Sequence, residues 1–183
     1  MSEQPPDRST HRSIPVTARP SADQEASSPS TNISPSTNIS QSTNGDPAEH
    51  RVTVFAAVGG QPFFDRLVER FYRGVEADDV LLPLYPEPED LGPARERLAL
   101  FLGQYWGGPP AYSELRGHPR LRMRHTPYAI GIRERDHWVA SMDAALRESI
   151  PETPLDEQLR SDVEQRMREY FAMAADHLVN QPG

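Results

Sequence analysis

The side chains best suited to metal chemistry lie in an arginine-rich segment in the middle of the chain. His118 stands in Gly117-His118-Pro119, a sequence typical of a turn, where a surface role suits it. His125 follows Leu121 and Met123 on a short apolar and basic stretch. A histidine in that place is either a core residue with a satisfied hydrogen bond or a metal ligand, since a neutral imidazole nitrogen binds transition metals. Spacing alone leaves both interpretations open.

Three aromatic side chains with a polar atom stand at helix or bend positions, namely Tyr72, Tyr85 and Trp138. A buried tyrosine or tryptophan needs an acceptor for its O–H or N–H group. If the three converge on one pocket, dioxygen held at a haem iron is an acceptor that fits them. The alternative is that each of them donates to a backbone carbonyl.

The same central segment holds four arginines, Arg116, Arg120, Arg122 and Arg124. Arginine pairs with carboxylates through two parallel hydrogen bonds, and haem carries two propionates. These residues therefore fit a haem edge, although a solvated basic patch is an equally good interpretation.

The other histidines point to simpler roles. His11 and His50 lie in the N-terminal segment, and His177 lies near the end of the last predicted helix, where a capping or surface role suits it. His137 adjoins Trp138 on a helix, so we expect it to face away from that residue's side and to be solvated. No histidine and carboxylate spacing predicts a non-haem metal site.

Composition excludes several classes of function. The chain has no cysteine, which excludes disulfides, cysteine-ligated zinc, iron–sulfur clusters and thiol catalysis, and which fits a cytoplasmic location. Residues 51–183 hold 16 basic and 21 acidic side chains, so we expect no nucleic acid partner. A phosphate-binding glycine motif and a nucleophilic triad are also missing from the sequence.

The elements that must position these residues are helices. Apolar side chains recur at spacings of three and four, which predicts long helices over about 61–77, 91–106, 134–149 and 155–179. All 14 aromatic residues lie after residue 50. Residues 1–50 contain a six-residue repeat (STNISP, STNISQ, STNGDP), and we expect them to form a disordered low-complexity extension. The sequence thus predicts an all-α domain over 51–183, with no signal peptide and no transmembrane segment.

Two motifs, YWGGP at 105–109 and RGHPRLRMRH at 116–125, together with Leu84-Tyr85-Pro86, resemble the truncated haemoglobins of the second group, the "O" type found widely in actinobacteria. The resemblance covers residues 55–179. It implies a truncated globin fold, a two-over-two helical sandwich with haem b between the helix pairs. One departure is the connection between Tyr85 and Ala94, which is longer than the family pattern and richer in proline.

The resemblance also implies roles for individual residues. His125 matches the proximal iron ligand, Tyr72 and Tyr85 match the two distal tyrosines, and Trp138 matches the indole that faces the bound ligand. Ala94 matches the position that holds a histidine in many globins. The haem contacts implied in this way are Ala94, Arg97, Leu98, Phe101, Tyr105, Tyr112, Arg122, Met123, Trp138 and Met142.

The implied function is to bind dioxygen and other diatomic ligands, such as nitric oxide and carbon monoxide, with slow oxygen release. We expect slow release to favour redox chemistry, such as detoxification of nitric oxide or peroxide with the help of a reductase. Two alternatives stay open: a non-catalytic oxygen binder, carrier or sensor, and a haemless helical domain that binds other proteins. A homo-oligomer also stays open.

Overall fold

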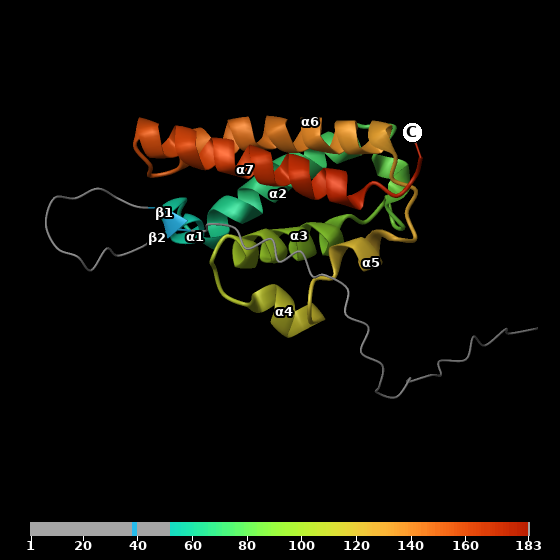
Figure 1. Ribbon diagram of the computed structural model, residues 1–183, viewed down its shortest axis with the longest axis horizontal. Helices are drawn as coiled ribbons and strands as arrows, with labels where there is room; N and C mark the ends of the chain where they lie inside the picture. Colours follow the sequence, from blue (N-terminus) through green and yellow to red (C-terminus); the bar gives the residue numbers. More distant parts are fainter. Residues whose placement is uncertain (1–37, 40–51, 183) are drawn as a thin grey trace, which may run out of the picture. The chain divides into compact units, whose positions relative to one another are not determined.

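The computed structural model describes residues 38–39 and 52–182 (Figure 1). Most described residues are helical, which confirms the expectation of an all-α truncated globin fold. The elements in order are β1 (Asn38–Ile39), β2 (Val52–Thr53), α1 (Val54–Ala57), α2 (Gln61–Glu76), η1 (Leu82–Leu84), α3 (Gly92–Tyr105), α4 (Ala111–Arg116), α5 (Leu121–His125), α6 (Ile132–Ser149), η2 (Ile150–Glu152) and α7 (Glu157–Leu178).

The four long helices fall where the sequence predicts them, with ends that differ by one or two residues. One difference is the start of α6, which begins at Ile132, two residues before the predicted start. The carboxylate of Glu134 accepts a hydrogen bond of 2.8 Å from the backbone N–H of Gly131. This capping contact satisfies an N–H group at the helix start, and so the helix begins two residues before the apolar pattern does.

A two-residue antiparallel pairing precedes the helices. Asn38 of β1 lies opposite Thr53 of β2, and Ile39 lies opposite Val52. These two residues belong to the second copy of the repeat. Residues 1–37 and 40–50 lie outside the described part, and for them disorder stays a prediction, as does a domain boundary near residue 50.

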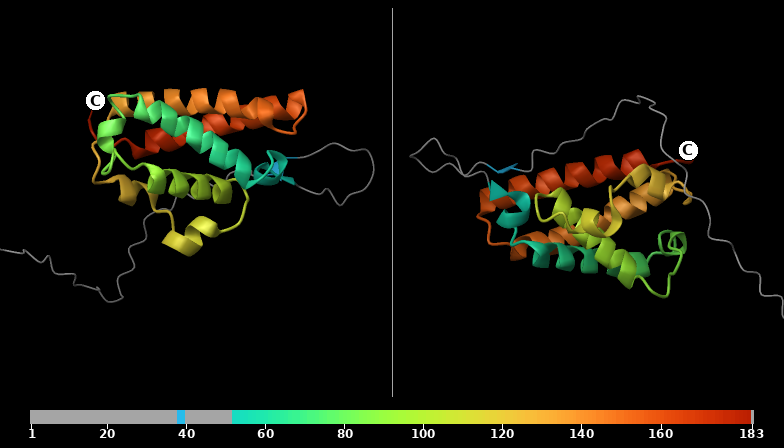
Figure 2. Two further views of the ribbon diagram at one scale, coloured as in Figure 1. Left: turned by 180° about the vertical axis from the view of Figure 1, so that it is seen from behind. Right: turned by 90° about the horizontal axis from the view of Figure 1, so that it is seen from below.

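The long helices form two antiparallel pairs. α2 runs against α3, and α6 runs against α7, while α2 also packs along α6 (Figures 1 and 2). The helices α2 and α6 approach closely at Gly74, where a Cβ atom would lie 3.4 Å from the Cβ and Oγ atoms of Ser141. A residue without a side chain is thus what lets the two backbones come together there.

The core is centred on α2. Seven of its side chains are buried, among them Phe63, Phe64 and Phe71, because its apolar residues repeat at helical spacing. Burying a side chain of this size stabilises a fold by about 1.5–3 kcal/mol. Because α2 contacts both helix pairs, its residues link the two halves of the domain.

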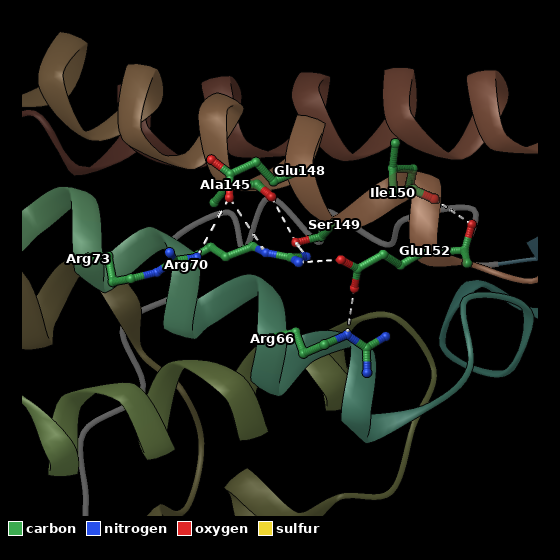
Figure 3. A network of polar contacts seen from close by, with 9 residues as sticks. Arg66, Arg70, Arg73, Ala145, Glu148, Ser149, Ile150 and Glu152 are labelled. Carbon is green, nitrogen blue, oxygen red and sulfur yellow. Dashed lines mark hydrogen bonds and ion pairs between the residues drawn. The ribbon is translucent and has the colours of Figure 1, made fainter.

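Polar contacts join the middle of α2 to the end of α6 (Figure 3). Arg70 donates a hydrogen bond of 2.9 Å to Oγ of Ser149, which is fully buried and donates in turn to the carbonyl of Ala145 at 2.8 Å. Arg70 also pairs with Glu152, and Arg66 lies 3.1 Å from the same carboxylate. We call these contacts the Arg70 network.

Candidate functional site

The segment that holds His125 is fixed by several hydrogen bonds before α5 begins. Arg120 has a left-handed backbone, with φ 42° and ψ 50°, an uncommon conformation for a residue with a side chain. The ring of His118 accepts a hydrogen bond of 3.2 Å from the backbone N–H of Arg120. Arg124 donates to the carbonyls of Pro119 and Arg116 at 2.9 and 2.8 Å. The turn is thereby held by its own side chains.

The ring of His125 has a defined hydrogen-bond partner. Its Nδ1 atom lies 2.7 Å from the carbonyl oxygen of Leu121, one helical turn earlier. Since a carbonyl only accepts, Nδ1 must carry the proton, and Nε2 of the neutral ring then keeps its lone pair. The side chain is half-buried. This arrangement is the one that orients a histidine as an axial ligand.

Residues at the end of α7 and just after it secure the other side of α5. The side-chain amide of Asn180 donates to the carbonyls of His125 and Tyr128 at 3.3 and 2.8 Å, and its oxygen accepts from the backbone N–H of Ile130 at 3.0 Å. Arg122 donates to the carbonyl of His177 at 3.3 Å. A five-residue helix is marginal alone, so α5 depends on these contacts.

Tyr72 of α2 and Tyr85, which follows η1, lie together. Their rings meet edge to face with centroids 5.6 Å apart, and their hydroxyls share a hydrogen bond. Burial raises the pKa of Tyr85 well above 10, and the nearby Tyr72 adds to the increase. Burial also raises the pKa of Tyr72, although Tyr85, Arg97 and Arg95 oppose the increase. Both hydroxyls therefore keep their protons at neutral pH.

Ring contacts through Phe71 connect Trp138 of α6 to the two tyrosines. The Trp138 ring lies 5.3 Å from the ring of Phe71, which lies 5.0 Å from that of Tyr72. Trp138 is half-buried and packs against the core. The structure thus brings Tyr72, Tyr85 and Trp138, here called the distal trio, into one aromatic cluster.

One face of α3 forms an apolar wall that is only partly covered. Ala94, Leu98, Phe101 and Tyr105 pack against the core yet keep part of their surface exposed. Phe101 contacts Tyr112 of α4 with ring centroids 5.5 Å apart, and Tyr105 stacks on Tyr170 of α7 at 3.9 Å. Burial raises the pKa of Tyr105 to about 12.

The remaining predicted contact residues are spread more widely. Arg97 is exposed on α3 and close enough to affect the pKa of Tyr72. Met123 of α5 is 58% exposed, an unusual exposure for methionine, whereas Met142 is fully buried among the core helices. The structure brings Met142 to the core side of α6 and leaves Met123 at the surface beside His125.

Two features of the site escaped the sequence analysis. Arg95 lies over the ring of Tyr72, with its guanidinium carbon 5.7 Å from the ring centroid, and it pairs with Glu76 and Glu69. The other is a contact of His137, which keeps 40% of its side chain exposed as expected, but whose Nδ1 atom lies 2.8 Å from Oδ2 of Asp78. Both contacts join segments distant in sequence, and no local pattern marks them.

The residues present fit a haem group. One imidazole has a free Nε2 lone pair, an apolar wall is partly uncovered, and three polar rings gather from α2, from the residue after η1 and from α6. Among the residues that the structure describes, no cluster of three histidine, aspartate or glutamate side chains is arranged to hold a metal by itself. Also within this part, no helix is long and apolar enough to cross a membrane.

Comparison with known proteins identifies the class of this fold and site. The model of the family described as "Bacterial-like globin" matches residues 53–173, and the chain belongs to this family. The group 2 truncated haemoglobin of Bacillus subtilis is 34% identical over 122 residues, which are 67% of this chain and 85% of that protein. Within the family, the chain is thus a group 2 truncated haemoglobin, as the sequence motifs predict.

Solved structures agree with this assignment. The thermostable haemoglobin of the actinobacterium Thermobifida fusca is 55% identical, with a TM-score of 0.65 over 72% of this chain and 100% of that one. The truncated oxygen-avid haemoglobin of Bacillus subtilis is 32% identical, with a TM-score of 0.59 over 69% of this chain and 98% of that one.

Proposed function

We propose that this chain holds haem b through Nε2 of His125, binds dioxygen on the side of the distal trio, and releases it slowly. Family membership implies haem and dioxygen binding, while the residue roles rest on the geometry of the site. The observation that carries the proposal is the hydrogen bond from His125 to Leu121, because it leaves one nitrogen free for the metal.

Haem would supply an iron that binds diatomic molecules and exchanges electrons. The chain's own residues would determine how long a ligand stays. Tyr85 and Tyr72 share one hydrogen bond, so one of their two protons remains available, and the indole N–H of Trp138 is a second donor. Each donor bond to a ligand adds about 1–3 kcal/mol in a site with little water.

The contact set we propose for the haem is the one that the resemblance implies. Leu98, Phe101 and Tyr105 offer apolar surface on α3, and the small side chain of Ala94 leaves room beside them. Arg97 and Arg122 are exposed and are candidates to pair with the propionates. Arg124 is less suited, because its guanidinium already holds two carbonyls. The remaining proposed contacts are Tyr112, Met123 and Met142.

Slow release suits chemistry at the iron better than oxygen delivery. We propose turnover of nitric oxide, in which nitric oxide, dioxygen and one electron give nitrate, with the electron supplied by a reductase in the cytoplasm. The description of the Bacillus subtilis relative as oxygen-avid supports the slow release. Peroxide and carbon monoxide are further ligands that the same donors would hold.

Absorption spectra of the purified, reduced and oxygenated protein test the proposal. We expect a Soret band in the wild type and in His118→Ala, whose ring faces only the turn, and loss of the histidine-ligated spectrum in His125→Ala. A His125→Ala variant with full haem content and the wild-type spectrum contradicts the ligand assignment. Oxygenated protein that consumes no more than one equivalent of nitric oxide with a reductase present contradicts the turnover.

A further inference from the structure

The helices α2 and α6 are tied together by polar contacts in two places. The Arg70 network joins the middle of α2 to the end of α6 and to η2 (Figure 3). The Asp78–His137 contact joins the other end of α2 to the first half of α6. Since the helices are antiparallel, these two ties lie on either side of the close approach at Gly74.

The carboxylate of Asp78 organises the chain between α2 and η1. Its Oδ1 atom accepts hydrogen bonds from the backbone N–H groups of Val80 and Leu81 at 2.8 and 3.0 Å. Its Oδ2 atom lies 2.8 Å from Nδ1 of His137, and only 19% of the side chain is exposed. One side chain thus fixes the turn toward Tyr85 and connects that turn to α6.

The three elements joined in this way carry the distal trio. Tyr72 lies on α2 before Asp78, Tyr85 follows η1, and Trp138 is the neighbour of His137 on α6. Their rings touch directly or through Phe71, so their relative positions follow those of the three backbones. Moving η1 or the start of α6 therefore changes the distances between the donors.

Packing on the outer side of this junction is sparse. A groove of about 660 Å³ runs between α2 and α6, and small side chains such as Ala140, Ser141 and Ala144 form part of it. Small side chains contribute little apolar contact, so the Asp78–His137 contact contributes more to the alignment of α2 and α6 at this end. Both Asp78 and His137 line this groove, and 40% of the His137 side chain is exposed.

The contact between Asp78 and His137 lies among other charged groups. Burial alone would raise the pKa of Asp78, but hydrogen bonds from His137, Leu81 and Val80 lower it below its ordinary value, so this carboxylate is ionised at neutral pH. Besides Asp78, His137 faces Glu134 on its own helix, and Asp136 and Arg73 line the same groove.

We propose that Asp78 and His137 are positioning residues that keep the distal trio aligned and thereby slow the release of oxygen. This inference rests on the function proposed above. Neither residue needs to touch the ligand. The pair acts through the turn before Tyr85 and through the backbone of Trp138.

The test compares two substitutions of one residue in the holoprotein. His137→Leu removes the donor, whereas His137→Asn keeps an amide N–H close to the place of Nδ1. We expect His137→Leu to speed oxygen release roughly three- to tenfold in stopped-flow measurements and His137→Asn to restore most of the difference. Glu152→Gln weakens the Arg70 network at the other end of the same helix pair and serves as the matched control, with an unchanged off-rate expected.

A second readout separates positioning from general loosening of the fold. The chain has two tryptophans, so ¹⁵N-labelled protein in its carbon monoxide form has two indole N–H signals. In His137→Leu we expect faster hydrogen exchange at Trp138 and an unchanged rate at Trp106, which is 2% exposed and far from the pair in sequence.

The outcomes are distinguishable. Equal acceleration at both indoles, or a wild-type off-rate in His137→Leu, overturns the positioning role while leaving the proposed function in place. A wild-type protein without a Soret band, or a distal trio whose replacement leaves oxygen release unchanged, means that the proposed function itself fails.

Discussion

The rings of Tyr72 and Tyr85 meet edge to face at 5.6 Å, and their hydroxyls share one hydrogen bond. A hydroxyl group has a single proton, so one tyrosine uses its proton within the pair and the other retains a free one. Burial raises the pKa values of both groups, so neither proton is lost at neutral pH. The pair thus acts as a unit that presents one donor.

Replacing two donors of the distal trio should speed oxygen release. For the double variant Trp138→Phe with Tyr85→Phe we expect an off-rate at least about tenfold higher, since each 1.4 kcal/mol of lost stabilisation is a factor of ten. Stopped-flow displacement of oxygen measures it. Trp106→Phe, which changes the tryptophan outside the trio, should leave the off-rate unchanged. A double variant with the wild-type off-rate contradicts this prediction.

Alkaline pH should destabilise the protein through the same tyrosines. Their folded-state pKa values lie above the unfolded value of 10.0, so the unfolded chain loses these protons first. Stability is therefore fully present below pH 10 and decreases as pH rises further toward the folded-state values. Urea unfolding between pH 9 and pH 11 should show a shallower decrease for Tyr85→Phe than for the wild type. Parallel curves would contradict this prediction.

Acidic pH should destabilise the protein through Asp78. Its folded-state pKa lies below the unfolded value of 3.8, so its contribution is present above that value and is lost as pH falls through the folded-state pKa. Glu152, whose pKa its hydrogen bond with Arg70 lowers, adds a change of the same sign. In Asp78→Asn the free energy of unfolding should decrease less than in the wild type as pH falls from 6 to 3. Urea unfolding at several pH values in this range measures it. An unchanged slope would show that Asp78 has no such role.

The junction of α1 and α3 should not tolerate a side chain at Gly108. A Cβ atom there would lie 2.6 Å from the ring of Phe55 and 2.7 Å from the carbonyl of Gly103. We expect Gly108→Ala to lower the free energy of unfolding by about 1–3 kcal/mol, as overpacking usually does. Gly92→Ala is the control, because its Cβ would meet only the flexible side chain of Asp90 at 3.1 Å. Equal unfolding midpoints would contradict the expectation.

The sequence predicted those parts of the structure that local patterns encode. The spacing of apolar residues predicts α2, α3, α6 and α7 almost to the residue, because burial of one face determines where a helix runs. The motifs around His125 and Tyr105 indicated the family. The contact between His137 and Asp78 was missed, because a pairing over 59 residues depends on how two helices cross and not on any local spacing.

The left-handed backbone of Arg120 was equally invisible to the sequence analysis. Glycine or asparagine usually marks such a position, and here the adjacent turn is held instead by His118 and Arg124. The assignment of His125 as ligand, with the contact set around it, remains a prediction.

The contacts of Asn180 have a consequence for how the protein is made. Its amide holds the carbonyl of His125 from 55 residues further along the chain. Because a ribosome synthesises the chain from its N-terminus, α5 emerges long before the residue that fastens it. The helices α2 and α3 can already associate at that stage, whereas the histidine segment waits for α7 and Asn180. The position of His125 would accordingly become fixed late in biosynthesis, after nearly the whole globin domain has left the ribosome.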